Sequence, residues 1–156
     1  MFRFGKQVES ALLALKALSE QKTQGLPISE ICSKHGLSKN TLSKIMQSLQ
    51  AAKILDSSQG LKGGYKLQRD LDFISFYEVL DALGEIKKLK CSEGESCNLV
   101  ENCSISSPLQ NWEREFEQHL KATSLNKLLN TEDNTKMNTE TKDKNEEPIK
   151  SEAVCL

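Results

Sequence analysis

The chain has 156 residues, 37% of them hydrophobic, which is enough for one compact domain with extensions. No run of about 18 apolar residues occurs, and Glu9 and Lys16 interrupt the apolar pattern of the N-terminal segment. We therefore expect neither a membrane span nor a secretory signal, and a protein that stays in the cytoplasm. The net charge of −1 conceals a basic half: residues 1–70 contain eleven Lys or Arg and five Asp or Glu, whereas residues 71–156 contain ten and seventeen.

The excess of basic residues in the first half favours a polyanionic partner, because Lys and Arg that neutralise phosphates release counterions and add sequence-independent affinity. Charge alone is weak evidence, since a solvated basic helix face gives similar counts. The five cysteines are an odd number in a chain without an export signal, which favours reduced thiols and metal or redox chemistry over a disulfide framework.

Three amphipathic helices are predicted in the first fifty residues. The first ends before the polar segment at residues 21–25, and the second runs from about Ser29 to a left-handed turn at Gly36. Ser38 is expected to cap the third helix by accepting a backbone N–H bond. The apolar positions are Val8, Ala11, Leu12, Leu15 and Leu18 in the first helix, Ile28, Ile31 and Cys32 in the second, and Leu42, Ile45, Met46 and Leu49 in the third.

Two short helices joined by a tight Gly turn predict a helix-turn-helix, and two short strands around a Gly-rich segment at residues 57–64 predict a hairpin wing. Such a wing reaches phosphates or the minor groove while the third helix enters the major groove of double-stranded DNA. Taken singly, a polar helix face can be merely solvated surface, and a Gly-rich hairpin can be merely a turn. The predicted DNA contacts are Lys39, Asn40, Thr41, Ser43 and Lys44 on the helix, with Gln59 and Lys62 on the wing.

Two further helices are predicted after the wing. Ser75 and Glu78 form a capping box at the start of one, which ends or bends at Gly84. Pro108 opens the other, whose apolar stripe requires either its own domain or a second subunit as a partner. The inward residues are Val79, Leu80 and Leu83 in the first of these helices, and the stripe is Leu109, Trp112, Phe116 and Leu120.

Between these helices lie three evenly spaced cysteines, Cys91, Cys97 and Cys103. Thiolates bind soft metals and iron-sulfur clusters, and five-residue gaps allow each sulfur to reach a different iron. Structural zinc usually shows ligand pairs two to four residues apart, so zinc is the weaker interpretation. The alternative without a metal is three ordinary thiols in a loop. Free cysteines are usually buried, however, whereas these lie among acidic and amide residues. Cys155 is assigned no role.

These elements together resemble the winged-helix iron-sulfur regulator family of IscR, NsrR and RirA. The resemblance rests on residues 26–55, 57–65 and 74–83 and on the cysteine triad, and it covers roughly residues 1–130. It implies a mainly α fold with a small β-hairpin, comprising a winged helix-turn-helix domain and a long C-terminal dimerisation helix. The domains expected are a DNA-binding unit at 1–70, a cluster loop and dimerisation helix at 71–130, and a disordered tail at 131–156.

The function that the resemblance implies is that of a homodimeric transcription regulator, a repressor, whose DNA affinity depends on a 4Fe-4S or 2Fe-2S cluster. That cluster would sense nitric oxide, redox state or iron-sulfur and iron status. The alternatives are a cluster-free regulator of the same fold, controlled by its thiols or by a partner, and an iron-sulfur carrier protein. No nucleophile–base pair or phosphate loop is found, so an enzyme is not expected.

Carried over to this chain, the resemblance makes Cys91, Cys97 and Cys103 the cluster ligands and leaves the fourth open. Ser106 stands where some members have a histidine, whereas Glu9 stands where others supply a carboxylate from the partner subunit. Glu9 is therefore the predicted fourth ligand, with a solvated helix residue as the equal alternative. His35 and His119 are lesser candidates. On the wing, Gln59 replaces a common arginine, and Lys62 compensates for the missing charge.

Overall fold

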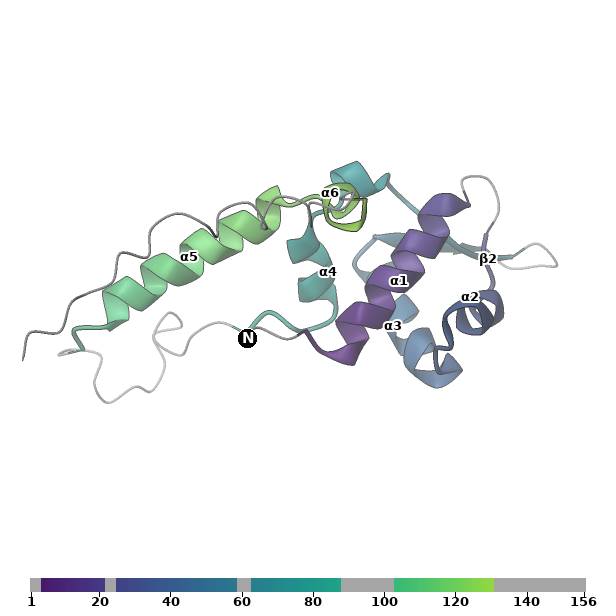
Figure 1. Ribbon diagram of the computed structural model, residues 1–156, viewed down its shortest axis with the longest axis horizontal. Helices are drawn as coiled ribbons and strands as arrows, with labels where there is room; N and C mark the ends of the chain where they lie inside the picture. Colours follow the sequence, from purple (N-terminus) through teal and green to yellow (C-terminus); the bar gives the residue numbers. More distant parts are fainter. Residues whose placement is uncertain (1–3, 22–24, 59–62, 88–102, 131–156) are drawn as a thin grey trace, which may run out of the picture.

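The structure is a computed structural model that describes residues 4–21, 25–58, 63–87 and 103–130. Its elements are α1 (Lys6–Glu20), α2 (Ile28–His35), α3 (Lys39–Ala51), β1 (Leu55–Ser58), β2 (Gly64–Leu67), the 3-10 helix η1 (Leu71–Phe73), α4 (Phe76–Ala82), α5 (Ser106–Ala122) and α6 (Leu125–Leu129). The first three helices and the hairpin gather at one end, α4 lies in the middle, and α5 runs away toward the other end (Figure 1). Within the described ranges, no helix has the length and apolar character needed to cross a bilayer.

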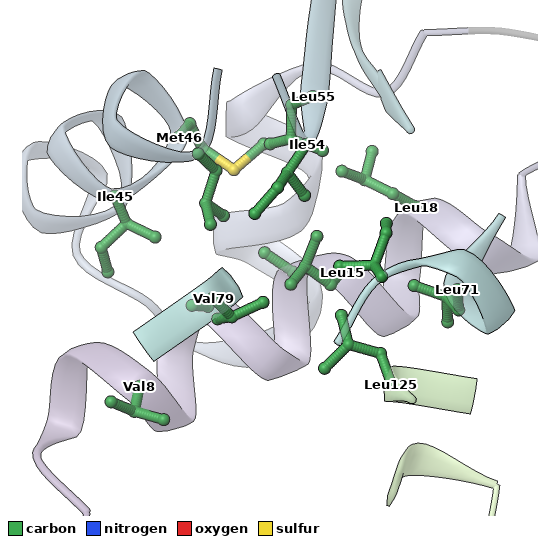
Figure 2. Close-up of a cluster of buried hydrophobic side chains, with 14 of the residues drawn as sticks. Val8, Leu15, Leu18, Ile45, Met46, Ile54, Leu55, Leu71, Val79 and Leu125 are labelled. Atoms are coloured by element: carbon green, nitrogen blue, oxygen red, sulfur yellow. The ribbon is translucent and has the colours of Figure 1, made fainter. Parts of the chain in front are cut away.

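The predicted fold class is confirmed: the molecule is mainly helical with one small antiparallel hairpin in its described part. One apolar core joins both ends of the described chain, because α1, α3, α4 and α6 all bury side chains in it. Figure 2 shows Leu15 of α1 at its centre, with Ile54, Val79 and Leu125 arriving from three other segments. Every fully buried side chain of the described residues is hydrophobic.

The helix-turn-helix forms as predicted. Gly36 adopts φ 65°, the left-handed conformation that glycine accepts without strain, and the Leu37 N–H donates to the Cys32 carbonyl across the turn at 3.1 Å. Ser38 is the N-cap residue of α3, but its side chain accepts no cap hydrogen bond, so that part of the prediction is wrong. The Ser38 backbone carbonyl still accepts the Leu42 N–H at 2.9 Å, which starts the helix without help from the hydroxyl.

The hairpin pairs β1 with β2 in antiparallel register, from Leu55 opposite Leu67 to Ser58 opposite Gly64. Tyr65 also exchanges two backbone hydrogen bonds with Leu26, at 2.9 and 3.0 Å, which ties the hairpin to the segment before α2. A side chain at Gly64 would stand 2.6 Å from the Leu26 backbone carbon, so this close approach requires glycine. The tip, which holds Gln59 and Lys62, lies outside the described residues.

The capping box at the start of α4 is confirmed. The Ser75 hydroxyl accepts the Glu78 backbone N–H at 3.2 Å, and the Glu78 carboxylate accepts the Ser75 backbone N–H at 2.8 Å. The helix stops where Gly84 takes φ 69°.

A short helix that the sequence analysis did not predict, α6, follows α5. It is held by long-range bonds, because the Leu125 N–H donates to the Ile74 carbonyl and the Phe76 N–H donates to the Thr123 carbonyl, both at 2.8 Å. Leu125 is fully buried. These bonds return the chain from the end of α5 to the core beside α4.

We predict that Ser75→Ala lowers the free energy of unfolding by about 1 kcal/mol, because the hydroxyl that accepts the Glu78 backbone N–H is lost, while the backbone N–H of residue 75 still donates to the Glu78 carboxylate. Ser38→Ala is the matched control. It removes a serine from an N-cap that makes no side-chain bond, so its cost should stay below about 0.5 kcal/mol. Urea unfolding followed by circular dichroism measures both. Equal losses in the two variants would contradict the assigned difference between the caps.

Candidate nucleic-acid interface and cysteine segment

The exposed face of α3 carries the predicted DNA contacts. Leu42, Met46 and Leu49 are fully buried, so the opposite face of the helix points outward. At 100° per residue, Asn40, Lys44 and Gln47 lie at the centre of that outer face. The structure exposes Lys39, Asn40, Thr41 and Lys44, and leaves Ser43 half-buried. Gln47 is equally exposed but was not chosen from the sequence, although its spacing of three from Lys44 was a visible signal.

The electrostatics of this face favour an anionic partner. Within the described part of the chain, neither Lys39 nor Lys44 has a carboxylate in ion-pair range. The strand beside the helix is different, because Lys66 pairs with Asp56 at 3.4 Å across the hairpin. The Gln50 side chain donates to the Ser57 hydroxyl at 2.9 Å, which links the end of α3 to β1. The α3 helix, which is the recognition helix of the helix-turn-helix, and the base of the hairpin are therefore held together.

An ion pair connects the end of the hairpin to α4. Arg69 lies two residues after β2 and contacts the Glu78 carboxylate at 2.7 Å, while it also donates to the Phe73 carbonyl at 3.1 Å. Partial burial raises the pKa of Glu78. This effect of burial is outweighed by hydrogen bonds from the Ser75 N–H and hydroxyl and by the Arg69 guanidinium, so the pKa of Glu78 is lowered overall. Glu78 thus stays ionised and holds the hairpin end to α4. This helix precedes the cysteine segment, which is the stretch from Cys91 to Cys103.

Of the three predicted cluster cysteines, the structure describes Cys103 alone. Its thiol is free and half-buried, three residues before α5 begins. Ser106 lies one turn away, where its N–H donates to the Cys103 carbonyl at 3.4 Å and its hydroxyl accepts the Gln110 amide at 3.2 Å. Cys91 and Cys97 lie outside the described residues, and the described ones contain no group of three metal-ligating side chains.

The other ligand candidates are spread over the fold. Glu9 is exposed in the first turn of α1, and Figure 1 shows the start of α1 well separated from the start of α5, which Cys103 precedes. A single described chain does not bring Glu9 and Cys103 together. His35 ends α2 with its Nε2 buried and without a hydrogen-bond partner among the described residues. His119 is exposed near the end of α5.

The outer part of α5 presents an apolar stripe to solvent. Ile105, Leu109, Trp112 and Phe116 recur at spacings of four, three and four, and Ile105 and Trp112 are each 61% exposed. The Trp112 and Phe116 rings stack with centroids 5.5 Å apart.

The inner end of α5 is anchored to α4. Leu120 is buried, and the Lys121 ammonium lies 4.7 Å above the Tyr77 ring while it also pairs with Glu117 at 2.6 Å. The anchor therefore holds one end of α5 and leaves the stripe at the other end uncovered by the described residues.

A helix-turn-helix with a hairpin wing, from which a long helix extends, defines a winged-helix regulator of transcription. The chain belongs to the Rrf2 family of iron-dependent transcriptional regulators, whose model matches residues 4–131. This confirms the family predicted from the sequence. A putative HTH-type transcriptional regulator of Aquifex aeolicus is 24% identical over 139 residues, which cover 83% of this chain and 93% of the relative. The relatives are regulators, so the chain is a transcriptional regulator and not an enzyme.

Solved structures share the fold. CymR, the global cysteine regulator of B. subtilis, superimposes with a TM-score of 0.63 at 18% identity, over 85% of this chain and 100% of that one. IscR of T. potens superimposes with a TM-score of 0.62 at 19% identity, over 87% and 92% of the two chains. At these identities the likeness establishes the winged-helix architecture alone.

Proposed function

We propose that this regulator binds double-stranded DNA in the cytoplasm as a homodimer, and that an iron-sulfur cluster held by Cys91, Cys97 and Cys103 controls its affinity. One observation carries the proposal. The cysteine segment joins the end of α4, which packs into the core that positions α3, to the start of α5, which carries the exposed apolar stripe. A change in that segment would act on both elements.

The DNA face is supported by exposure and charge. The outer face of α3 is polar and basic, free of ion pairs in the described structure, and held rigidly by α1, α2 and β1. Side chains of this kind hydrogen-bond base edges and phosphates when a helix lies in the major groove. The proposed contacts are Lys39, Asn40, Thr41, Ser43 and Lys44, with Gln59 and Lys62 from the wing.

Lys44→Ala should weaken binding to DNA and lower the slope of log affinity against log salt by about 1, because one ammonium–phosphate contact is lost. The matched control is Lys16→Ala on the exposed part of α1, which removes the same charge away from α3. Fluorescence anisotropy with a duplex selected by the wild-type protein from a random library provides the measurement. A Lys44→Ala slope equal to that of the wild type would remove this lysine from the interface.

The dimer is supported by the α5 stripe. Ile105, Leu109, Trp112 and Phe116 form one apolar strip on a helix whose other end is anchored on α4. A strip of this kind is stabilised by burial against an equivalent strip, and a two-fold interface presents the same patch from both subunits. Two recognition helices related by that axis would meet two half-sites of a palindromic operator.

Trp112→Ala should raise the dissociation constant of the dimer at least about tenfold, since a large aromatic at the centre of such a strip carries much of the binding energy. Gln118→Ala, on the opposite face of α5, should leave it unchanged. Sedimentation equilibrium distinguishes the two. A Trp112→Ala protein that dimerises as tightly as the control would show that the stripe serves another contact.

The cluster rests on the cysteine triad, of which the structure describes one member. The Cys103 thiol is free and half-buried, and a cysteine sulfur in its thiolate form is the donor that holds cluster iron, so its chemistry fits. Glu9 is the proposed fourth ligand. Because it lies far from Cys103 within one chain, it would have to come from the partner subunit. When bound, the cluster supplies a redox-active and reactive centre that nitric oxide, oxygen or iron shortage can alter.

The chain's own residues would carry the signal. Cys103 precedes α5 by three residues, so a bond to its sulfur fixes the start of that helix. Lys121, Tyr77 and Glu117 hold its other end to α4, and Arg69 holds α4 to the hairpin through Glu78. Movement at Cys103 would therefore be transmitted toward the DNA face through packed elements.

Anaerobically purified protein should show visible absorption with stoichiometric iron and sulfide, and Cys97→Ser should lose it, because a ligand is removed from the centre. Ser96→Ala, a neighbour without a thiol, should keep it, and Glu9→Ala should shift the spectrum if Glu9 is the fourth ligand. A colourless wild type that reconstitutes no iron would instead favour a regulator controlled by thiols or by a partner protein. Cluster transfer without any binding to DNA would favour a carrier.

A further inference from the structure

A hollow of about 270 Å³ lies beside the DNA face of α3. Three elements form it, namely the first turn of α1, the outer side of α3 and the end of α4. Its lining residues are Gln7 from α1, Asn40, Thr41, Lys44, Ile45 and Ser48 from α3, and Leu83 at the end of α4. The hollow therefore shares Asn40, Thr41 and Lys44 with the surface already proposed to meet DNA.

The side chains that line the hollow are suited to bind an oxyanion. Gln7 offers an amide N–H₂, Lys44 an ammonium, and Thr41 and Ser48 hydroxyls, whereas no carboxylate lines the hollow. Within the described part of the chain, these four side chains make no hydrogen bond or ion pair. The donors are thus available, and one of them is positively charged, which is the combination that binds phosphate oxygens.

Two carboxylates lie near the start of α1, namely Glu9, which is exposed in its first turn, and Glu85. The Glu85 Oε1 would lie 3.3 Å from a side chain added at Gly5, so both charges oppose an anion at this end of the helix. Neither carboxylate lines the hollow. The anion therefore has to be held by the donors of α3 and Gln7 rather than by the end of α1.

We infer that the hollow receives a phosphate of the DNA backbone, and that Gln7 and Ser48 contact DNA in addition to the recognition helix. The inference rests on the proposed function, in which α3 enters the major groove. Backbone phosphates border that groove on both sides, so a helix lying in it brings phosphates to its flanks. DNA is favoured over a free anion because three lining residues belong to the DNA face itself.

The site also connects DNA binding to the cysteine segment. Leu83 lines the hollow and is the C-cap residue of α4, from which the chain leads into that segment. A local shift at Leu83, which is half-buried and lies just past the last turn of α4, would change the shape of the hollow while leaving the packing of α3 against α1 and the exposed centre of α3 intact. The phosphate contact would then respond to the signal more strongly than contacts to bases.

The test is a cycle between protein and DNA variants. Wild type and Gln7→Ala are titrated against the selected duplex and against copies of it, each with one phosphate replaced by an uncharged methylphosphonate. Gln7→Ala should lower affinity on the order of tenfold for unmodified DNA, as expected for a lost bond to a charged group. When the phosphate that occupies the hollow has been replaced by a methylphosphonate, Gln7→Ala should lower the affinity no further. One such phosphate is expected in each half-site. Ser48→Ala should couple to the same phosphate, and Gln118→Ala should couple to none.

If the affinity losses from Gln7→Ala and from the methylphosphonate were additive at every phosphate, the inference would be overturned. Lys44→Ala would still weaken binding in that case, so the DNA-binding proposal would survive. A wild type that binds no selected duplex would overturn both. A third arm adds inorganic phosphate at constant ionic strength and follows thermal stability. Stabilisation that disappears in Gln7→Ala, with DNA affinity unchanged, would assign the hollow to a free anion and also overturn the inference.

Discussion

Burial of one face of α1 is the constraint on which the rest of the structure depends. That face packs against α2, α3, α4 and β2, and its central Leu15 is completely buried. Burial of one such side chain contributes about 2 kcal/mol, but the larger effect is geometric. Because a close-packed interior does not deform continuously, α3 and α4 are fixed relative to each other through α1. The recognition helix therefore cannot move independently of the helix that leads to the cysteines.

A second set of contacts is polar and lies at the surface. Arg69 and Glu78 join the hairpin end to α4, and Tyr77, Glu117 and Lys121 join α4 to α5. Exposed ion pairs of this kind add little to stability, so their value here is orientation. They set the direction in which α5 leaves the core, and with it the spacing that two recognition helices would adopt in a dimer. Apolar packing stabilises the fold, and these polar contacts orient α4 and α5 within it.

Local sequence signals predicted the elements whose formation depends on near neighbours. The stripe of Leu42, Met46 and Leu49, the turn at Gly36 and the capping box at Ser75 all follow from spacing or from a residue's own chemistry. Two features were misjudged or missed, and distant groups decide only the second. The Ser38 hydroxyl makes no cap bond although its position is right, and α6 depends on Leu125 reaching a carbonyl fifty-one residues away. Gln7 joins a hollow near α3 through tertiary packing, which no motif reveals.

The central claim is that the cysteine segment controls the DNA face through α4 and α5. The most direct measurement titrates one anaerobic preparation against its selected duplex with the cluster intact, and again after the iron has been chelated. Iron content, dimer state and folding are checked on both samples. The account predicts affinities that differ at least about tenfold, with both samples still dimeric. Equal affinities from a sample shown to have held and then lost its cluster would contradict it.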